Sequence, residues 1–237
     1  MSYAPMLARE LETGTWQLAW TQAVPRMRWL AVKVVALLTL IVVLVGAFAA
    51  LVTWFRQPLD RLYGPFGAGA FDVEALAPMA YALFAFAAGA AAGALLRRSV
   101  PAVAVSLFAF VAARVSVESV LRPRYRTPLA LIENIPASGH GVAIGTGNRS
   151  DWTLDQGFAD ATGRHLVSTD INTMDDAARD SGVGLATYMH DRGIQRWVSY
   201  HPAGRFWEFQ LVEAGIFAAV SAVLLAVVIW RVKRRAL

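Results

Sequence analysis

Four stretches of the sequence are almost free of charged residues, and polar segments separate them. The apolar stretches cover residues 29–54, 76–96, 100–120 and 206–230. A helix of about 20 residues, rising about 1.5 Å per residue, crosses the roughly 30 Å of hydrocarbon in a bilayer. The pattern therefore predicts an all-α integral membrane protein. Three transmembrane helices are expected in residues 29–120, and a fourth with a basic tail in residues 206–237.

The polar segment before the first span, residues 1–28, has the spacing of an amphipathic helix. In residues 5–24 the apolar side chains fall on one side, while Glu10 and Glu12 face outward. The segment lacks the apolar core and small-residue cleavage site of a signal peptide. Two interpretations stay open: a helix that contacts a partner protein at the membrane face, and an interfacial helix that anchors the terminus.

The segments between the spans differ in length and character. "QPLDRLYGPFGAGAFD", which follows the first span, is rich in Gly and Pro and is interpreted as a connecting loop with room for a small re-entrant turn. Residues 121–205 are expected to form a small, mostly helical extracytoplasmic domain. Within it, "TMDDAARDSG" has the signature of a helix, with Thr173 as N-cap and Gly182 after its end. "DWTLDQGFADATG" is a weaker helical candidate.

Composition and charge agree with a membrane location and indicate an orientation. The chain is 57% hydrophobic and only 16% charged, with a net charge of +5. Its basic clusters flank the spans at residues 26–33, 97–98 and 231–235, which four crossings place on one side. Because cytoplasmic loops carry the excess of Lys and Arg, both termini are expected in the cytoplasm, with the protein in the plasma membrane. No basic stripe with interleaved aromatics indicates a nucleic-acid partner.

Several classes of chemistry are excluded by missing residues. The chain has no Cys, which excludes disulfides and thiolate metal sites. Neither of its two lysines, Lys33 and Lys233, follows a Gly as the lysine of a phosphate-binding loop must. All four histidines lie in residues 121–205, where their spacing matches no zinc motif, although a site formed with loop aspartates stays conceivable. We therefore expect neither enzyme activity nor a cofactor in this chain.

Two groups of residues within the spans invite a functional interpretation. Gly89 and Gly93 form "GAAAG", whose small residues four apart allow another helix to approach closely, although general Ala richness explains the same letters. Arg114 and Glu118 lie four residues apart on one face of the third span, where charges are costly unless they are paired. They are interpreted either as a polar lining near the outer mouth of a pathway or as a structural clasp.

"RELETGTWQLAWTQAVPRMRWLAVK", at the start of the chain, resembles the cytoplasmic segment of type-2 ABC transporter permeases. The likeness continues through "FDVEALAPMAYALFAFAAGAAAGALLRRSVPA", "LRPRYRTP" and "HPAGRFWEFQLVEAGIF", and it points to an actinobacterial branch of that family. The resemblance implies a coupling segment that contacts a separate ATP-binding subunit, which would bind ATP and Mg. The residues that it assigns to this contact are Glu10, Glu12, Gly14, Thr15 and Arg26.

The resemblance also implies an ABC exporter that works as a homodimer or as a heterodimer with a sister permease. Such permeases usually have two further spans before the coupling segment. The sequence is thus expected to lack them, either because its start was chosen too far downstream or because it is a natural short form. The alternative function is a non-transporting membrane protein whose extracytoplasmic loop senses a ligand or scaffolds a complex.

Overall fold

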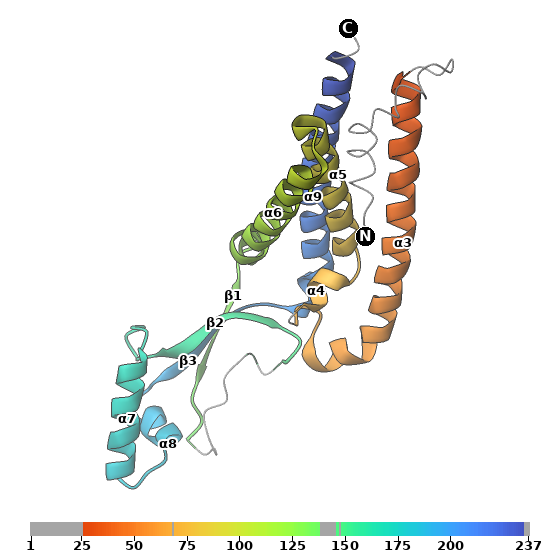
Figure 1. Cartoon of the computed structure of the whole chain (residues 1–237). Coiled ribbons are helices and arrows are strands. Elements are labelled where there is room, and N and C mark those ends of the chain that lie inside the picture. Colours follow the sequence, from red (N-terminus) through yellow and green to blue (C-terminus); the bar gives the residue numbers. More distant parts are fainter. Residues whose placement is uncertain (1–25, 68, 138–145, 147, 235–237) are drawn as a thin grey trace. The chain divides into compact units, whose positions relative to one another are not determined.

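The computed structural model describes residues 26–67, 69–137, 146 and 148–234, and it divides into two compact units (Figure 1). The first unit contains the described residues up to Gln57, Gly69–Tyr125 and the described residues from Trp207 onward. The second contains the described residues of Pro58–Ala68 and Arg126–Phe206.

The first unit is built from long helices. They are α3 (Arg26–Tyr63), whose last residues from Pro58 belong to the second unit, α5 (Ala77–Leu96), α6 (Ser99–Ser116) and α9 (Phe206–Arg234), which enters the unit at Trp207. The short α4 (Ala70–Val73) lies between α3 and α5. Four helical segments among the described residues are long and apolar enough to cross a membrane. The prediction of an all-α membrane protein with four spanning helices is confirmed.

The small residues of α5 explain why this helix lies inside the unit. Its run of Ala and Gly lets neighbouring helices approach closely. Ala90 and Ala91 pack with Val228 of α9, and the partly buried Leu224 and Leu225 pack against this cluster. Gly89 and Gly93 are also buried in α5. Their role as a packing seam stays a prediction. By contrast, α3 and α6 expose large apolar side chains such as Val35 and Phe108, as helices in contact with lipid do.

The helix α3 continues beyond the point where the sequence predicts a loop. Pro58 lies inside it, and the helix ends only at Tyr63, so the expectation of a loop from Gln57 was wrong. Extending an existing helix adds one hydrogen bond per residue, which outweighs the single donor that proline lacks. Gly64 then stops the helix with a positive φ of 78°, and its N–H donates to Asp60 O at 3.0 Å.

The second unit combines a small antiparallel sheet with two helices. The strands β1 (Leu129–Asn134), β2 (Trp152–Ala159) and β3 (Gln195–His201) lie in the order β1-β3-β2. The helices α7 (Ser168–Asp180) and α8 (Leu185–Asp191) follow β2 in the chain. Their shared core with the sheet consists of Ile135, Phe158, Leu166, Ala186, Met189 and Ile194.

Two local predictions for this unit were wrong. "DWTLDQGFADATG" contains strand β2, which pairs with β3 about forty residues later in the sequence, and a local pattern does not report such a distant partner. The helix α7 begins at Ser168, so Thr173 lies in its interior and donates its hydroxyl to Thr169 O at 2.9 Å. Asp170 accepts the backbone N–H of Val167 instead. Gly182 does follow the helix end, with a φ of 66°.

Candidate functional site

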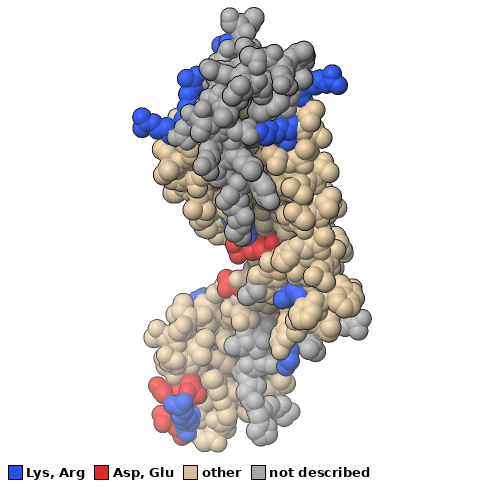
Figure 2. Space-filling model, turned by 45° about the vertical axis from the view of Figure 1, so that its right-hand side comes forward, with Lys and Arg blue, Asp and Glu red and all other residues tan. Residues whose placement is uncertain are grey.

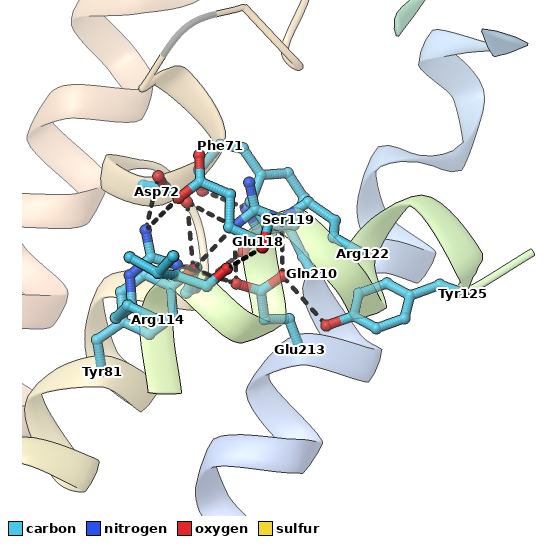
Figure 3. A network of polar contacts seen from close by, with 12 residues as sticks. Phe71, Asp72, Tyr81, Arg114, Glu118, Ser119, Arg122, Tyr125, Gln210 and Glu213 are labelled. Carbon is cyan, nitrogen blue, oxygen red and sulfur yellow. Dashed lines mark hydrogen bonds and ion pairs between the residues drawn. The ribbon is translucent and has the colours of Figure 1, made fainter. Parts of the chain in front are cut away.

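Four charged side chains form a closed ring at one end of the first unit (Figure 3). Asp72 comes from α4, Arg114 from α6, Arg122 from the 3₁₀ turn η2 (Arg122–Arg124) and Glu213 from α9. Asp72 Oδ2 lies 2.7 Å from Arg114 Nη2, and Asp72 Oδ1 accepts from Arg122 Nη2 at 2.6 Å. Glu213 Oε1 accepts from Arg122 Nη2 at 2.8 Å and from Arg114 Nη1 at 3.3 Å. Positive and negative groups thus alternate around this charge ring.

The hydroxyl of Tyr81, on α5, contacts all four members of the charge ring. Arg114 Nη1 donates to it at 2.9 Å and Arg122 Nη2 at 3.4 Å. Asp72 Oδ1 lies 3.3 Å from the same hydroxyl, and Glu213 also accepts a hydrogen bond from it. Because a hydroxyl has one hydrogen and two lone pairs, the bonds from the two arginines and the bond to Glu213 already use its full bonding capacity. Tyr81 therefore joins α5 to the four elements α4, α6, η2 and α9.

Burial makes the balance of charge in the ring important. The side chain of Glu213 has no exposed surface, and that of Arg122 is only 7% exposed. Arg114 and Asp72 are 14% and 20% exposed. An unpaired charge at such a depth costs several kcal/mol, whereas two arginines and two carboxylates neutralise one another. Each guanidinium also covers an aromatic ring: Arg114 lies over Tyr81 and Arg122 over Phe71.

The two arginines reach the same ring because α6 ends in an irregular turn. Residues eight apart on a regular α-helix differ by about 80° around its axis. Here α6 continues as the π-helical turn η1 (Val117–Leu121), whose wider turns rotate the chain less per residue. This lower rotation brings Arg122 round towards the face that carries Arg114. Such π-turns occur frequently at functional sites.

Two further side chains border the charge ring. Glu118 lies 3.7 Å from Arg114 and is 52% exposed, so the sequence-predicted pair is present but is the weakest contact of that arginine. Its role as the lining of a pathway stays a prediction. Tyr125 donates its hydroxyl to Glu213 Oε2 at 3.3 Å. Burial, together with the negative charge of Glu213, raises the pKa of Tyr125 above its ordinary value.

A second set of bonds fixes the short α4–α5 segment beside the ring. Gln210 of α9 accepts the backbone N–H groups of Leu76 and Ala77 at 3.2 and 2.8 Å, and it donates to Phe71 O at 2.8 Å. Because these donors lie at the start of α5, the amide does the work of an N-terminal cap. On the other side, Arg56 of α3 binds the buried Glu74. One carboxamide thus joins α9 to both neighbouring helices.

Sequence reasoning identified one pair of these residues and missed the rest of the ring. Arg114 and Glu118 are local neighbours, whereas Asp72, Arg122 and Glu213 come from three distant segments. The available signal was that Asp72 and Arg122 lie just outside apolar stretches and that Glu213 is an acidic residue within the first half of another. Among the described residues, no three His, Asp or Glu side chains gather into a group that holds a metal.

The sequence assigns a separate set of residues to ATPase coupling. Glu10, Glu12, Gly14 and Thr15 lie outside the described residues. Arg26 is the first residue of α3, and its side chain also lies outside them. Their assignment stays a prediction.

The other end of the spans carries basic residues only, among those that the structure describes. We call Arg97, Arg98, Arg231, Lys233 and Arg234 the basic end. Arg97 and Arg98 form the turn between α5 and α6, and the other three close α9. On the face shown, Figure 2 has basic side chains gathered above a band of uncharged surface.

Comparison with known proteins identifies the family. Residues 3–122, half of the chain, match the family described as ABC-2 membrane transporter related. The match includes Asp72, Tyr81, Arg114 and Arg122, whereas Glu213 lies beyond it. Comparisons with curated proteins and with solved structures gave no significant match. The chain therefore belongs to the ABC-2 membrane transporter related family and is a multi-pass permease subunit of an ABC-type transporter.

Proposed function

We propose that this permease exports its substrate across the plasma membrane and that a separate subunit hydrolyses ATP for it. The family assignment supports an ATPase partner in general. The chain itself is proposed to be no enzyme and to bind no cofactor, with ATP and Mg held by the partner. The observation that carries the proposal is the charge ring, because a balanced set of ion pairs that joins several spans at one end is suited to holding a transporter closed there.

We further propose an orientation in which the ring lies on the outer side. The basic end is assigned to the cytoplasm because Lys and Arg favour that side of a membrane. Both termini are then cytoplasmic, and the second unit, Arg126–Phe206 with the short Pro58–Ala68 segment, is extracytoplasmic. In this orientation the charge ring lies at the extracytoplasmic ends of the spans, where an exporter releases its substrate.

The ring is proposed to act as the outer latch of the transport cycle. All four charges already have partners, and the hydroxyl of Tyr81 is saturated, so the ring is suited to holding its own members together. Opening the outer side would separate the carboxylates on α4 and α9 from the arginines on α6 and η2. Water that enters the opened site would solvate the separated charges and so reduce the free energy needed to separate the ion pairs.

Force from the ATPase is proposed to enter at the opposite side. By resemblance, Glu10, Glu12, Gly14 and Thr15, together with Arg26, contact the ATP-binding subunit. A pathway between two copies of the permease, or between this chain and a sister permease, would then alternate between an inner and an outer opening. An amphipathic helix that only anchors the terminus is the competing interpretation.

The first experiment asks whether an ATPase accompanies the chain. The tagged protein is extracted from its native membrane in a mild detergent, and the purified material is assayed for an ATP-binding subunit and for ATP hydrolysis. Co-purification of a stoichiometric, active ATPase is expected. A chain that is isolated alone, from membranes in which it is abundant, supports the alternative function as a sensor or scaffold.

The second experiment tests the latch within that complex. Asp72→Asn removes the ring charge that is easiest to separate, and Glu118→Gln is the matched control, since it removes an adjacent carboxylate that is largely exposed. Asp72→Asn is expected to keep the ATPase bound while changing its hydrolysis rate several-fold, because the outer side no longer closes. Equal hydrolysis rates for wild type and both variants contradict a role for the ring in the cycle.

A further inference from the structure

The basic end brings together cations from two parts of the chain. Ala90 and Ala91 of α5 pack with Val228 of α9, so these two helix ends are neighbours. Arg97 lies nearly two helical turns beyond Ala91 along α5, and Arg231 lies about one turn beyond Val228 along α9. The turn that contains Arg97 and Arg98 therefore lies close to the end of α9.

These cations lack anionic partners within the part of the chain that the structure describes. No described carboxylate forms an ion pair with Arg97, Arg98, Arg231, Lys233 or Arg234. The Nε atom of Arg231 is buried and has no hydrogen-bond acceptor among the described residues. A buried donor without an acceptor is costly, and the cost is greater when the donor is charged. The arrangement calls for an anion from outside the described chain.

We propose that the basic end binds the phosphate group of an anionic phospholipid, with Arg97, Arg98 and Arg231 as its ligands. The turn also lies at the N-terminus of α6, whose helix dipole adds partial positive charge where the phosphate would bind. Basic pockets between spans at the cytoplasmic face are suited to anionic headgroups in this way.

The apolar neighbours of these cations favour a lipid over a soluble phosphate. Leu95 and Leu96 are 48% and 42% exposed immediately before Arg97, and Trp230 is 49% exposed immediately before Arg231. Arg234 stacks over the Trp230 ring at 4.3 Å. Tryptophan gathers at the headgroup level of membranes. A ligand that carries both a phosphate and acyl chains satisfies the arginines and covers these apolar side chains together.

The test compares membranes that differ only in headgroup charge. The purified full chain is reconstituted in nanodiscs of phosphatidylcholine, with or without phosphatidylglycerol, and its melting temperature is measured by tryptophan fluorescence. Native mass spectrometry counts the phospholipid that stays bound after release into detergent. We expect phosphatidylglycerol to raise the melting temperature and to be retained preferentially.

The double variant Arg97→Gln/Arg231→Gln is expected to lose the thermal shift and several-fold of the retained lipid. Arg149→Gln/Arg192→Gln is the matched control, because it removes the same charge from exposed positions in the second unit. A separate variant, Arg231→Lys, keeps the charge without the Nε donor and is expected to retain part of the shift. It also keeps the test informative if the double variant does not fold.

Three results would overturn the proposal. If phosphatidylglycerol shifts the melting temperature equally in both double variants, it acts through the overall charge of the chain. An equal shift produced by inorganic phosphate in phosphatidylcholine nanodiscs identifies a site for a small soluble anion. The third result has two parts: the wild-type chain does not preferentially retain phosphatidylglycerol, and the arginines are protected from chemical modification only when the ATPase subunit is present. Together these identify a protein contact.

Discussion

The two ends of the first unit both depend on arginine, but they use it in opposite ways. At the charge ring, Arg122 is buried and Arg114 is partly buried, and each binds both carboxylates of the ring. At the basic end, Arg97 and Arg231 have no ion-pair partner among the described residues. Paired, buried arginines contribute to the stability and specificity of the fold, whereas the unpaired ones are those that we propose to orient the chain and to bind lipid. Four substitutions test this contrast, from the largest expected effect to the smallest.

Removing the central carboxylate of the ring should be the most damaging change. Glu213→Gln keeps the shape of the side chain but leaves two buried arginines sharing Asp72. Breaking a buried ion pair by neutralising one partner costs about 3–5 kcal/mol. The free energy of unfolding, measured by denaturant titration in detergent with tryptophan fluorescence, should fall by that amount. Glu118→Gln, at an exposed position, should change it by less than about 1 kcal/mol. Equal losses in the two variants would contradict the importance of burial.

Removing the Tyr81 hydroxyl should have a smaller effect, because all four charges stay in place. Tyr81→Phe deletes the one group that contacts every ring member and leaves the aromatic packing intact. Loss of a buried hydrogen-bonding partner costs about 1–3 kcal/mol. The same denaturant titration measures this loss in the free energy of unfolding. A double-mutant cycle with Glu213→Gln should show strong non-additivity, since both changes act on one network. Simple additivity would mean that the hydroxyl is not the link described here.

An arginine at the basic end should matter little for stability in plain detergent. Arg97→Gln removes an exposed charge without a described partner, and such substitutions change stability by within about 0.5 kcal/mol. Arg122→Gln is the comparison at the ring, where a loss like that of Glu213→Gln is expected. Unfolding of both variants in a neutral detergent without added lipid measures the difference. A loss of comparable size for Arg97→Gln would remove the distinction between the two ends.

The smallest effect concerns a solvated ion pair in the second unit. Hydrogen bonds from Thr162 and from the backbone of Arg164 lower the pKa of Asp160 to about 2, from an ordinary value near 3.8. Because the pKa is lower in the folded state, its contribution to stability is complete above pH 3.8 and is lost as the pH falls towards 2. Melting temperatures of wild type and Asp160→Asn should therefore converge between those values. A constant difference across that range would show that the carboxylate does not titrate as described.

The contrast also separates what the sequence could predict from what it could not. The spans, the basic end and the helix stop at Gly182 depend on hydropathy or on neighbours in sequence, and they were predicted. Arg114 and Glu118 were recognised because four residues make one helical turn. The charge ring was not, since Asp72 and Glu213 meet only after four helices have packed. We recognise no sequence signal for the π-turn at Val117–Leu121, which changes the rotation of the helix and brings Arg122 towards Arg114.

The second unit shows the same limit in another form. The sequence of strand β2 resembles that of a weak amphipathic helix. A register shift between Thr153 and Asp155 also interrupts the alternation of side chains along the strand. Its pairing with β3, rather than its own propensity, decides its structure. For α7 the helix itself was predicted, but Thr173 was given the capping role that belongs to the backbone at Val167 and the carboxylate of Asp170. Local chemistry thus identified a helix without fixing where it starts.

The position of Glu213 in the chain has a consequence for biosynthesis. A hydrogen bond joins Tyr81 to Glu213 across 132 residues, and the Arg126–Phe206 part of the second unit lies between them in the sequence. While the ribosome is still making that segment, Arg114 and Arg122 are already in or near the bilayer with Asp72 as their shared carboxylate. Charges left in that state are costly in a membrane. The helix α9 is made after α3, α5 and α6 and therefore completes the neutralisation of the ring, and a chain truncated before it would hold two arginines that share Asp72.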